Sequence, residues 1–97
     1  MIKVKVKPKN ISIAGHAEYD EYGKDIVCSS VSSIVTTTVN GILIFGKKTI
    51  DYKIREGLVT IDIIENDETT KKLLDNMVNL LSNLEADYPK NIKVERE

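Results

Sequence analysis

The chain has 97 residues, within the size of one domain, and its 41% hydrophobic and 30% charged residues are ordinary for a globular protein. The 14 basic and 15 acidic residues leave a net charge of −1, which argues against a direct nucleic-acid partner. We see no stretch of the ~20 apolar residues that spans a bilayer and no secretory signal, so we expect no membrane partner. A lone cysteine suits a reducing compartment. We therefore expect one cytoplasmic domain over 1–97.

The first predicted elements form a β-hairpin. Residues 2–7 alternate apolar side chains with lysines, as a half-buried strand does, and residues 11–16 alternate again after a turn at 8–10. Ile11 and Ile13 should point into the core. The opposite face of the second strand then carries Ser12, Ala14 and His16.

A long helix should follow a polar loop at 18–24. Asp25 is a good N-cap for it, and Gly46 is a natural end. An alternative is a stop at Gly41 followed by a strand over 42–45, because β-branched residues and an internal glycine weaken the helix. The apolar stripe of the helix consists of Val27, Val31, Ile34, Val35, Thr38, Ile42 and Phe45.

The second half of the chain repeats this order of hairpin and helix. Residues 49–54 and 58–64 alternate around a turn that contains Gly57, which predicts a second hairpin. Asn66-Asp67 can cap a second helix that ends before Pro89. Its stripe consists of Leu73, Leu74, Met77, Leu80, Leu81 and Leu84.

Ile92 and Val94 indicate a short last strand. The predicted order is β-β-α-β-β-α-β. The simplest fold for this order is a two-layer α+β domain in which both helices pack on one face of a mostly antiparallel sheet.

The candidate chemistry lies between the first hairpin and the first helix. Cys28 falls in the predicted first helical turn, where free amides and the helix dipole favour a thiolate, and a loop can bring His16 to it as the base. The amides of Cys28 and Ser29 are candidate oxyanion donors. Asp25 either caps the helix or orients His16, and Gly15 leaves room for a substrate backbone.

Each of these residues also has a structural interpretation without chemistry. A lone cysteine such as Cys28 is often an inert buried thiol, and His16 at a strand end can be a surface residue. One cysteine and one histidine are too few for a metal site, and we expect no cofactor. Two other functions remain open: a non-catalytic binding module that keeps the cysteine only for packing, and a thiol redox sensor that needs a partner thiol.

The run Gly15-His16-Ala17, followed by Gly23-Lys24-Asp25-Ile26-Val27-Cys28 and by Val31-Ser32, resembles the ribosomal-processing cysteine protease family. The resemblance implies an endopeptidase that removes the N-terminal extension of a ribosomal large-subunit protein, with cleavage after an aromatic-rich stretch. It also implies that Cys28 is the nucleophile and His16 the histidine, with Asp25 and Ser32 in supporting roles.

The same resemblance implies a homodimer and a loop at 18–24 that orders over substrate. The chain departs from the family at Ser29-Ser30, where the residues after the cysteine are usually small ones such as alanine. Serine is nearly as small, so the expected activity stands. Glu18, Asp20 and Glu21 make the loop acidic, which would attract a basic ribosomal tail.

Overall fold

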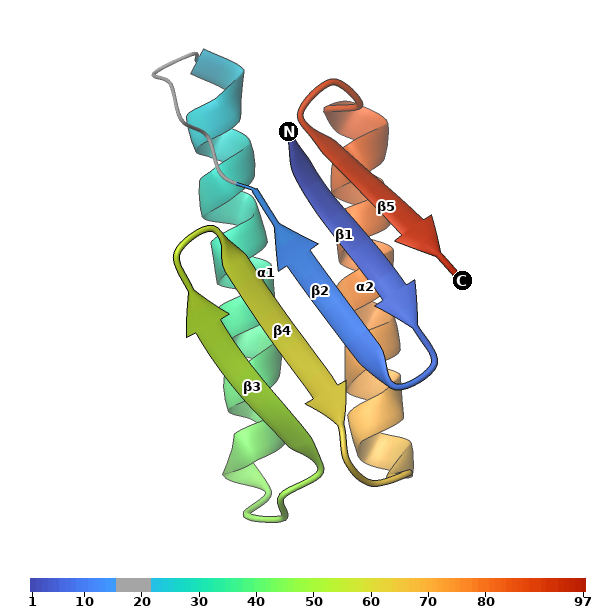
Figure 1. Cartoon of the computed structure of the whole chain (residues 1–97). Helices are drawn as coiled ribbons and strands as arrows, with labels where there is room; N and C mark the ends of the chain where they lie inside the picture. The colour runs from blue at the N-terminus through green and yellow to red at the C-terminus, as the bar shows by residue number, and fades with distance from the viewer. Residues whose placement is uncertain (16–21) are drawn as a thin grey trace.

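In the part of the chain that the structure describes, five strands and two helices make up the fold (Figure 1). The computed structural model of the chain describes residues 1–15 and 22–97, and describes the side chains of 1–15 and 26–97. In chain order the elements are β1 (Ile2–Lys7), β2 (Asn10–Ala14), α1 (Tyr22–Ile44), β3 (Ile50–Arg55), β4 (Leu58–Ile63), α2 (Glu68–Asp87) and β5 (Ile92–Arg96).

The strands form one mixed sheet in the order β3-β4-β2-β1-β5. Neighbouring strands are antiparallel except β5, which runs parallel to β1. Figure 1 shows α1 and α2 side by side on the same face of this sheet, with the other face uncovered. The predicted two-layer α+β fold is therefore confirmed.

The alternation of the strands sorts their side chains between the two faces. In β1, Ile2 and Val4 are buried under the helices, whereas Lys3, Lys5 and Lys7 lie exposed on the open face. Ile11 and Ile13 of β2 are buried, as predicted. The core is completed by Ile50, Ile61 and Ile92 of the sheet and by Val27, Val31, Val35, Val39, Ile42, Leu74, Met77, Val78 and Leu81 of the helices.

The first helix is continuous through Gly41, so the alternative of a strand over 42–45 is wrong. Its buried residues recur every three or four positions from Val27 to Ile42, which places one stripe against the sheet. The helix ends at Ile44, and Gly46 adopts a left-handed φ of 75° in the turn that follows.

The beginning of α1 differs from the prediction. The helix starts at Tyr22, so Asp25 lies inside its first turn and is not the N-cap. The residues from 18 to 24 are polar, and no apolar side chains recur among them at helical spacing. A loop and a helical turn that packs against no core have the same pattern, so the sequence could not tell them apart. The side chain of Asp25 and residues 16–21, which include most of the predicted loop, lie outside the described part of the structure.

The segment Ile26–Ile44 of α1 is long and apolar enough to cross a membrane by length and composition, contrary to the expectation that no segment would be. Its inward side chains, Val27 and Val31 among them, form the centre of the core. Core helices of soluble proteins meet the same criterion, because a helix that covers a sheet needs a similar length of apolar residues.

The second helix confirms its predicted cap and most of its stripe. Asp67 is the N-cap, and its carboxylate accepts a hydrogen bond of 2.9 Å from the amide of Thr70. The prediction for Leu80 is wrong, because this side chain is 41% exposed. The buried stripe runs instead through Thr70 and Val78, and Leu80 lies beside it.

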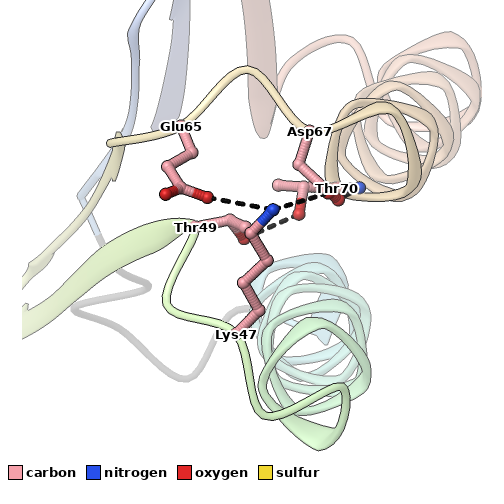
Figure 2. A network of polar contacts seen from close by, with 5 residues as sticks. All are labelled: Lys47, Thr49, Glu65, Asp67 and Thr70. Atoms are coloured by element: carbon pink, nitrogen blue, oxygen red, sulfur yellow. Dashed lines mark hydrogen bonds and ion pairs between the residues drawn. The ribbon is translucent and has the colours of Figure 1, made fainter.

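A polar network joins the start of β3 to the start of α2 (Figure 2). The hydroxyls of Thr49 and Thr70 are 2.6 Å apart and satisfy each other in a buried position. Beside them, the Lys47 ammonium lies 3.3 Å from Glu65 and 3.8 Å from Asp67. The network holds the turn after α1 against the cap of α2.

Asp67 should make stability depend on pH. Hydrogen bonds from Thr70, with Lys47 acting in the same direction, hold the pKa of Asp67 below its usual value. Because the pKa of Asp67 is lower in the folded state, its carboxylate stabilises the fold at every pH above its unfolded-state pKa of about 3.9. This stabilisation is lost as the pH falls through the folded-state pKa. Asp67→Asn keeps the cap oxygen without the charge. Urea midpoints should show the unaltered chain more stable at pH 7, with a smaller difference at pH 3; a constant difference would contradict this.

Gly15 marks the point where the chain leaves the sheet. Its φ is 99°, and a Cβ atom built on it would collide with the backbone carbonyl of Met1. Its amide donates a 2.8 Å hydrogen bond to the carbonyl of Gly57 in the β3–β4 turn. The end of β2 is therefore held between the N-terminus and the second hairpin.

Gly15→Ala should lower the free energy of unfolding by about 1–3 kcal/mol, because a left-handed φ and a backbone collision both oppose a side chain there. Gly46→Ala is the matched control. Gly46 also has a positive φ, of 75°, but a Cβ atom on it meets nothing within 4 Å. Chemical denaturation should find the Gly15 variant clearly less stable than the Gly46 variant; equal losses would count against the collision.

Candidate active site

Cys28 lies in the second turn of α1, at the border of the buried stripe. It is partly exposed and packs against the hydrophobic core. It follows Val27, which is buried against the sheet, and precedes Val31 by one turn. Because these neighbours are fixed by packing, the position of the cysteine follows from the rotation of the helix.

The thiol borders a cavity of about 310 Å³ between α1 and the β3–β4 hairpin. This size is at the lower end of the range for small-ligand pockets. The lining residues come from β1, β2, α1 and the hairpin: Ile2, Ile13, Gly15, Cys28, Val31, Ser32, Val35, Thr36, Tyr52, Ile54, Arg55, Gly57, Leu58 and Val59.

The walls of this cavity are mainly aliphatic, with few polar groups. Ser32 contributes a hydroxyl one turn after Cys28, on the same side of the helix. Burial raises the pKa of Tyr52 above its usual value of 10.0, so its phenol is neutral at physiological pH and can donate a hydrogen bond. Arg55 is the one charged residue among the described residues that line the cavity.

The earlier helix start changes the expected oxyanion site. Cys28 and Ser29 are the seventh and eighth residues of α1, so their amides belong to the i to i−4 ladder and are not the free donors of a first turn. The expectation that these two amides hold an oxyanion therefore fails. The dipole also weakens beyond the first turn, so its effect at Cys28 is smaller than the sequence suggested.

The other predicted site residues are divided by the fold. Gly15 and Ser32 line the cavity with Cys28. Ser29 instead borders a groove on the side of α1 that faces α2, because a residue one position along a helix is rotated by about 100°. His16 and the side chain of Asp25 lie outside the described residues, although His16 follows Gly15 directly in the chain.

The sequence did not reveal the wall that the second hairpin contributes. Tyr52, Ile54 and Leu58 come from a segment more than 20 residues from Cys28, and their alternation indicated only a hairpin. Ile54 is 66% exposed although its strand position faces the helices. Within the described part of the chain, no group of three or more His, Cys, Asp or Glu side chains could hold a metal ion.

Comparison with known proteins shows the family to which the chain belongs. Residues 1–93 match the family model of the cysteine protease Prp. The ribosomal processing cysteine protease Prp of Staphylococcus aureus (strain NCTC 8325 / PS 47) is 31% identical over 91 residues, which cover 91% of this chain and 86% of that protein. The protein of the same name from Bacillus subtilis (strain 168) is 27% identical over 92 residues, covering 88% and 82%.

Two crystal structures of the essential ribosomal processing protease Prp from S. aureus share the fold along the whole of both chains. The complex with a substrate peptide has a TM-score of 0.92 at 25% identity. The complex with a covalently linked product peptide has a TM-score of 0.85 at 27% identity. By its family match, its relatives and its fold, this chain belongs to the family of the cysteine protease Prp.

Proposed function

We propose that this chain is an endopeptidase that removes the N-terminal extension of a ribosomal large-subunit protein, with Cys28 as the nucleophile. The related proteins from S. aureus and B. subtilis are named ribosomal processing proteases, and the S. aureus enzyme has been crystallised with a substrate peptide. The same enzyme also forms a complex with a covalently linked product peptide, which is the kind of adduct a cysteine nucleophile makes.

The observation that carries the proposal is that Cys28, the single cysteine of the chain, opens onto an apolar cavity beside the hairpin. A thiol buried among aliphatic side chains on every side could not reach a peptide bond. Here it borders space large enough for a side chain, with aliphatic walls and the ring of Tyr52. Such walls suit the aromatic-rich stretch that precedes the expected cleavage site.

The proposed reaction proceeds through a thioester. His16 takes the proton of the Cys28 thiol, and the sulfur attacks the carbonyl carbon of the scissile peptide bond. The C–N bond then breaks as His16 gives the proton to the leaving amine. Water attacks the thioester while His16 accepts its proton, which releases the extension as a carboxylate and restores the thiol.

Ser32 is our candidate for a donor to the oxyanion. The amides of Cys28 and Ser29 are used within α1, so another group must stabilise the developing charge. The Ser32 hydroxyl lines the same cavity one turn further along the helix. A hydroxyl can rotate to donate to the oxygen without any change in the backbone.

We further propose that the protein acts in the cytoplasm as a homodimer. No charged residue occurs from Ile26 to Phe45, and Leu43, Ile44 and Phe45 are 49%, 82% and 67% exposed at the end of α1. Exposed apolar groups that adjoin one another favour an interface. A second copy of the chain would cover them in a two-fold arrangement.

The catalytic assignment is tested by mixing the purified chain with the extended ribosomal protein. Cys28→Ala should abolish cleavage, and His16→Ala should lower kcat/KM by about 10²–10⁴-fold, the usual contribution of a general base. Both variants should keep the thermal melt of the unaltered chain. Cleavage that persists in Cys28→Ala would end the proposal, and binding without cleavage by the unaltered chain would favour a non-catalytic binding module.

Ser32→Ala should lower kcat by about 10-fold or more with little change in KM, because an oxyanion donor acts mainly in the transition state. Ser33→Ala is the matched control, since this exposed serine faces the groove toward α2 and not the cavity. Steady-state kinetics of the two variants make the comparison. Equal kcat values for both would remove Ser32 from the mechanism.

Sedimentation equilibrium tests the dimer. The unaltered chain should sediment at twice its 10.9 kDa mass, and Ile44→Glu should shift it toward the monomer because a charge would be buried in the interface. Glu95→Lys, a charge change on the uncovered face of the sheet, is the control. A monomer at every concentration would contradict the proposal.

A further inference from the structure

β3 is an edge strand of the sheet, and among the described residues no strand pairs with its outer side. It pairs with β4 on one side, and the strand order ends there. The amide of Ile64 donates to the carbonyl of Thr49 at 2.8 Å, which identifies these two as a hydrogen-bonded pair of the antiparallel ladder. Hydrogen-bonded and non-hydrogen-bonded pairs alternate along an antiparallel ladder. Counting in steps of two from Thr49, the backbone groups of Lys53 and Arg55 therefore form hydrogen bonds with β4.

The intervening residues Tyr52 and Ile54 therefore direct their N–H and C=O groups away from β4. A second hydrogen bond supports this alternation, because the amide of Gly15 donates to the carbonyl of Gly57. The odd-numbered residues from Gly57 along β4 therefore form backbone hydrogen bonds with β2. The even-numbered residues of β4 form theirs with β3. Among the described residues, no backbone hydrogen bond to Tyr52 or Ile54 occurs on the outer edge.

The same two residues carry side chains that line the cavity at Cys28. Ile54 is 66% exposed, so an apolar surface is open at the end of this edge. On the other face of the strand the neighbours are charged, and Lys53 lies 3.7 Å from Asp51. The edge thus combines free backbone groups, an apolar face toward the cavity and a charged face toward solvent.

We propose that the substrate binds in an extended conformation as a sixth strand on the edge of β3. Its backbone exchanges hydrogen bonds with Tyr52 and Ile54, which leads the chain into the cavity at Cys28. This inference rests on the proposed function, because it assigns the peptide substrate of that site to the edge. Continuity between the edge and the cavity favours the substrate over a second copy of the chain as the occupant.

The arrangement also sets a pattern for the substrate sequence. Side chains of an added strand alternate between the two faces of the sheet. Every second residue of the bound segment then faces the cavity side and should be apolar. The residues between them face Asp51 and Lys53 and should be polar or charged.

Two variants at one position isolate the backbone contribution. Ile54→Ala and Ile54→Pro both lose the apolar side chain, but only proline loses the outward N–H, and edge strands tolerate proline at such a position. Both are made in the Cys28→Ala background, and binding of a fluorescently labelled peptide that spans the ribosomal extension is measured by polarisation. Ile54→Pro should bind about 2- to 12-fold more weakly than Ile54→Ala, the equivalent of one net hydrogen bond.

Single N-methylation of successive peptide amides supplies the second measurement. Strand addition requires that methylation weakens binding at every second residue, because only alternate amides face β3. Equal binding by the two Ile54 variants together with no period of two would overturn the proposal, as would the absence of any peptide binding. If β3 paired instead with a second copy of the chain, Ile54→Pro would change the sedimenting mass, and N-methylation would weaken peptide binding equally at every residue or not at all. That result would also overturn the proposal.

These readouts separate the inference from the proposed function. Binding to the Cys28→Ala protein requires no catalysis, so a chain that cut no peptide would still reveal the period of two if the edge binds substrate. Conversely, efficient cleavage by the unaltered chain, together with equal affinity of the two Ile54 variants in the Cys28→Ala background and no period of two, would support the protease function and reject strand addition. Thermal melts of the two Ile54 variants that agree within a few degrees confirm that they are equally folded.

Discussion

The packing of one helical stripe on the sheet determines the rest of the site. Val27, Val31 and Val35 are almost fully buried, so α1 cannot rotate without exposing them. Each buried aliphatic side chain contributes about 1.5–3 kcal/mol relative to exposure, and the stripe therefore fixes the helix firmly. Cys28 is the neighbour of this stripe and Ser32 lies one turn beyond it, and both face the second hairpin as a consequence.

The second hairpin connects the site to the remainder of the sheet. Its turn accepts the hydrogen bond from Gly15, the residue before His16, so the same turn borders the cavity and holds the end of β2. At the opposite end, the Thr49–Thr70 pair and the Asp67 cap tie this hairpin to α2. The hairpin is thereby supported at both ends by groups that carry no chemistry themselves.

The apolar surfaces of the molecule are distributed unevenly in a way that suits the proposed activity. The uncovered face of the sheet is rich in charged side chains, with Lys3, Lys5 and Lys7 on one strand. Exposed apolar side chains adjoin one another in two groups: Leu43, Ile44 and Phe45 at the end of α1, and Ile54 and Leu58 at the tip of the β3–β4 hairpin. We assign the first to a second copy of the chain and the second to the substrate, because the hairpin tip lines the same cavity as Cys28.

The sequence by itself determined the order of elements, both hairpins, the cap at Asp67 and most of the core, because periods of two and of three to four residues are local properties. Its motif also predicts Cys28 as the nucleophile. The sequence-based prediction of an N-cap at Asp25 was wrong, because a polar stretch has no periodicity that separates a loop from a helical turn. The prediction that Leu80 is buried was also wrong. Only the tertiary structure brought Tyr52 and Ile54 to the cysteine and left the edge of β3 open, because contacts between distant segments depend on packing that no local pattern records.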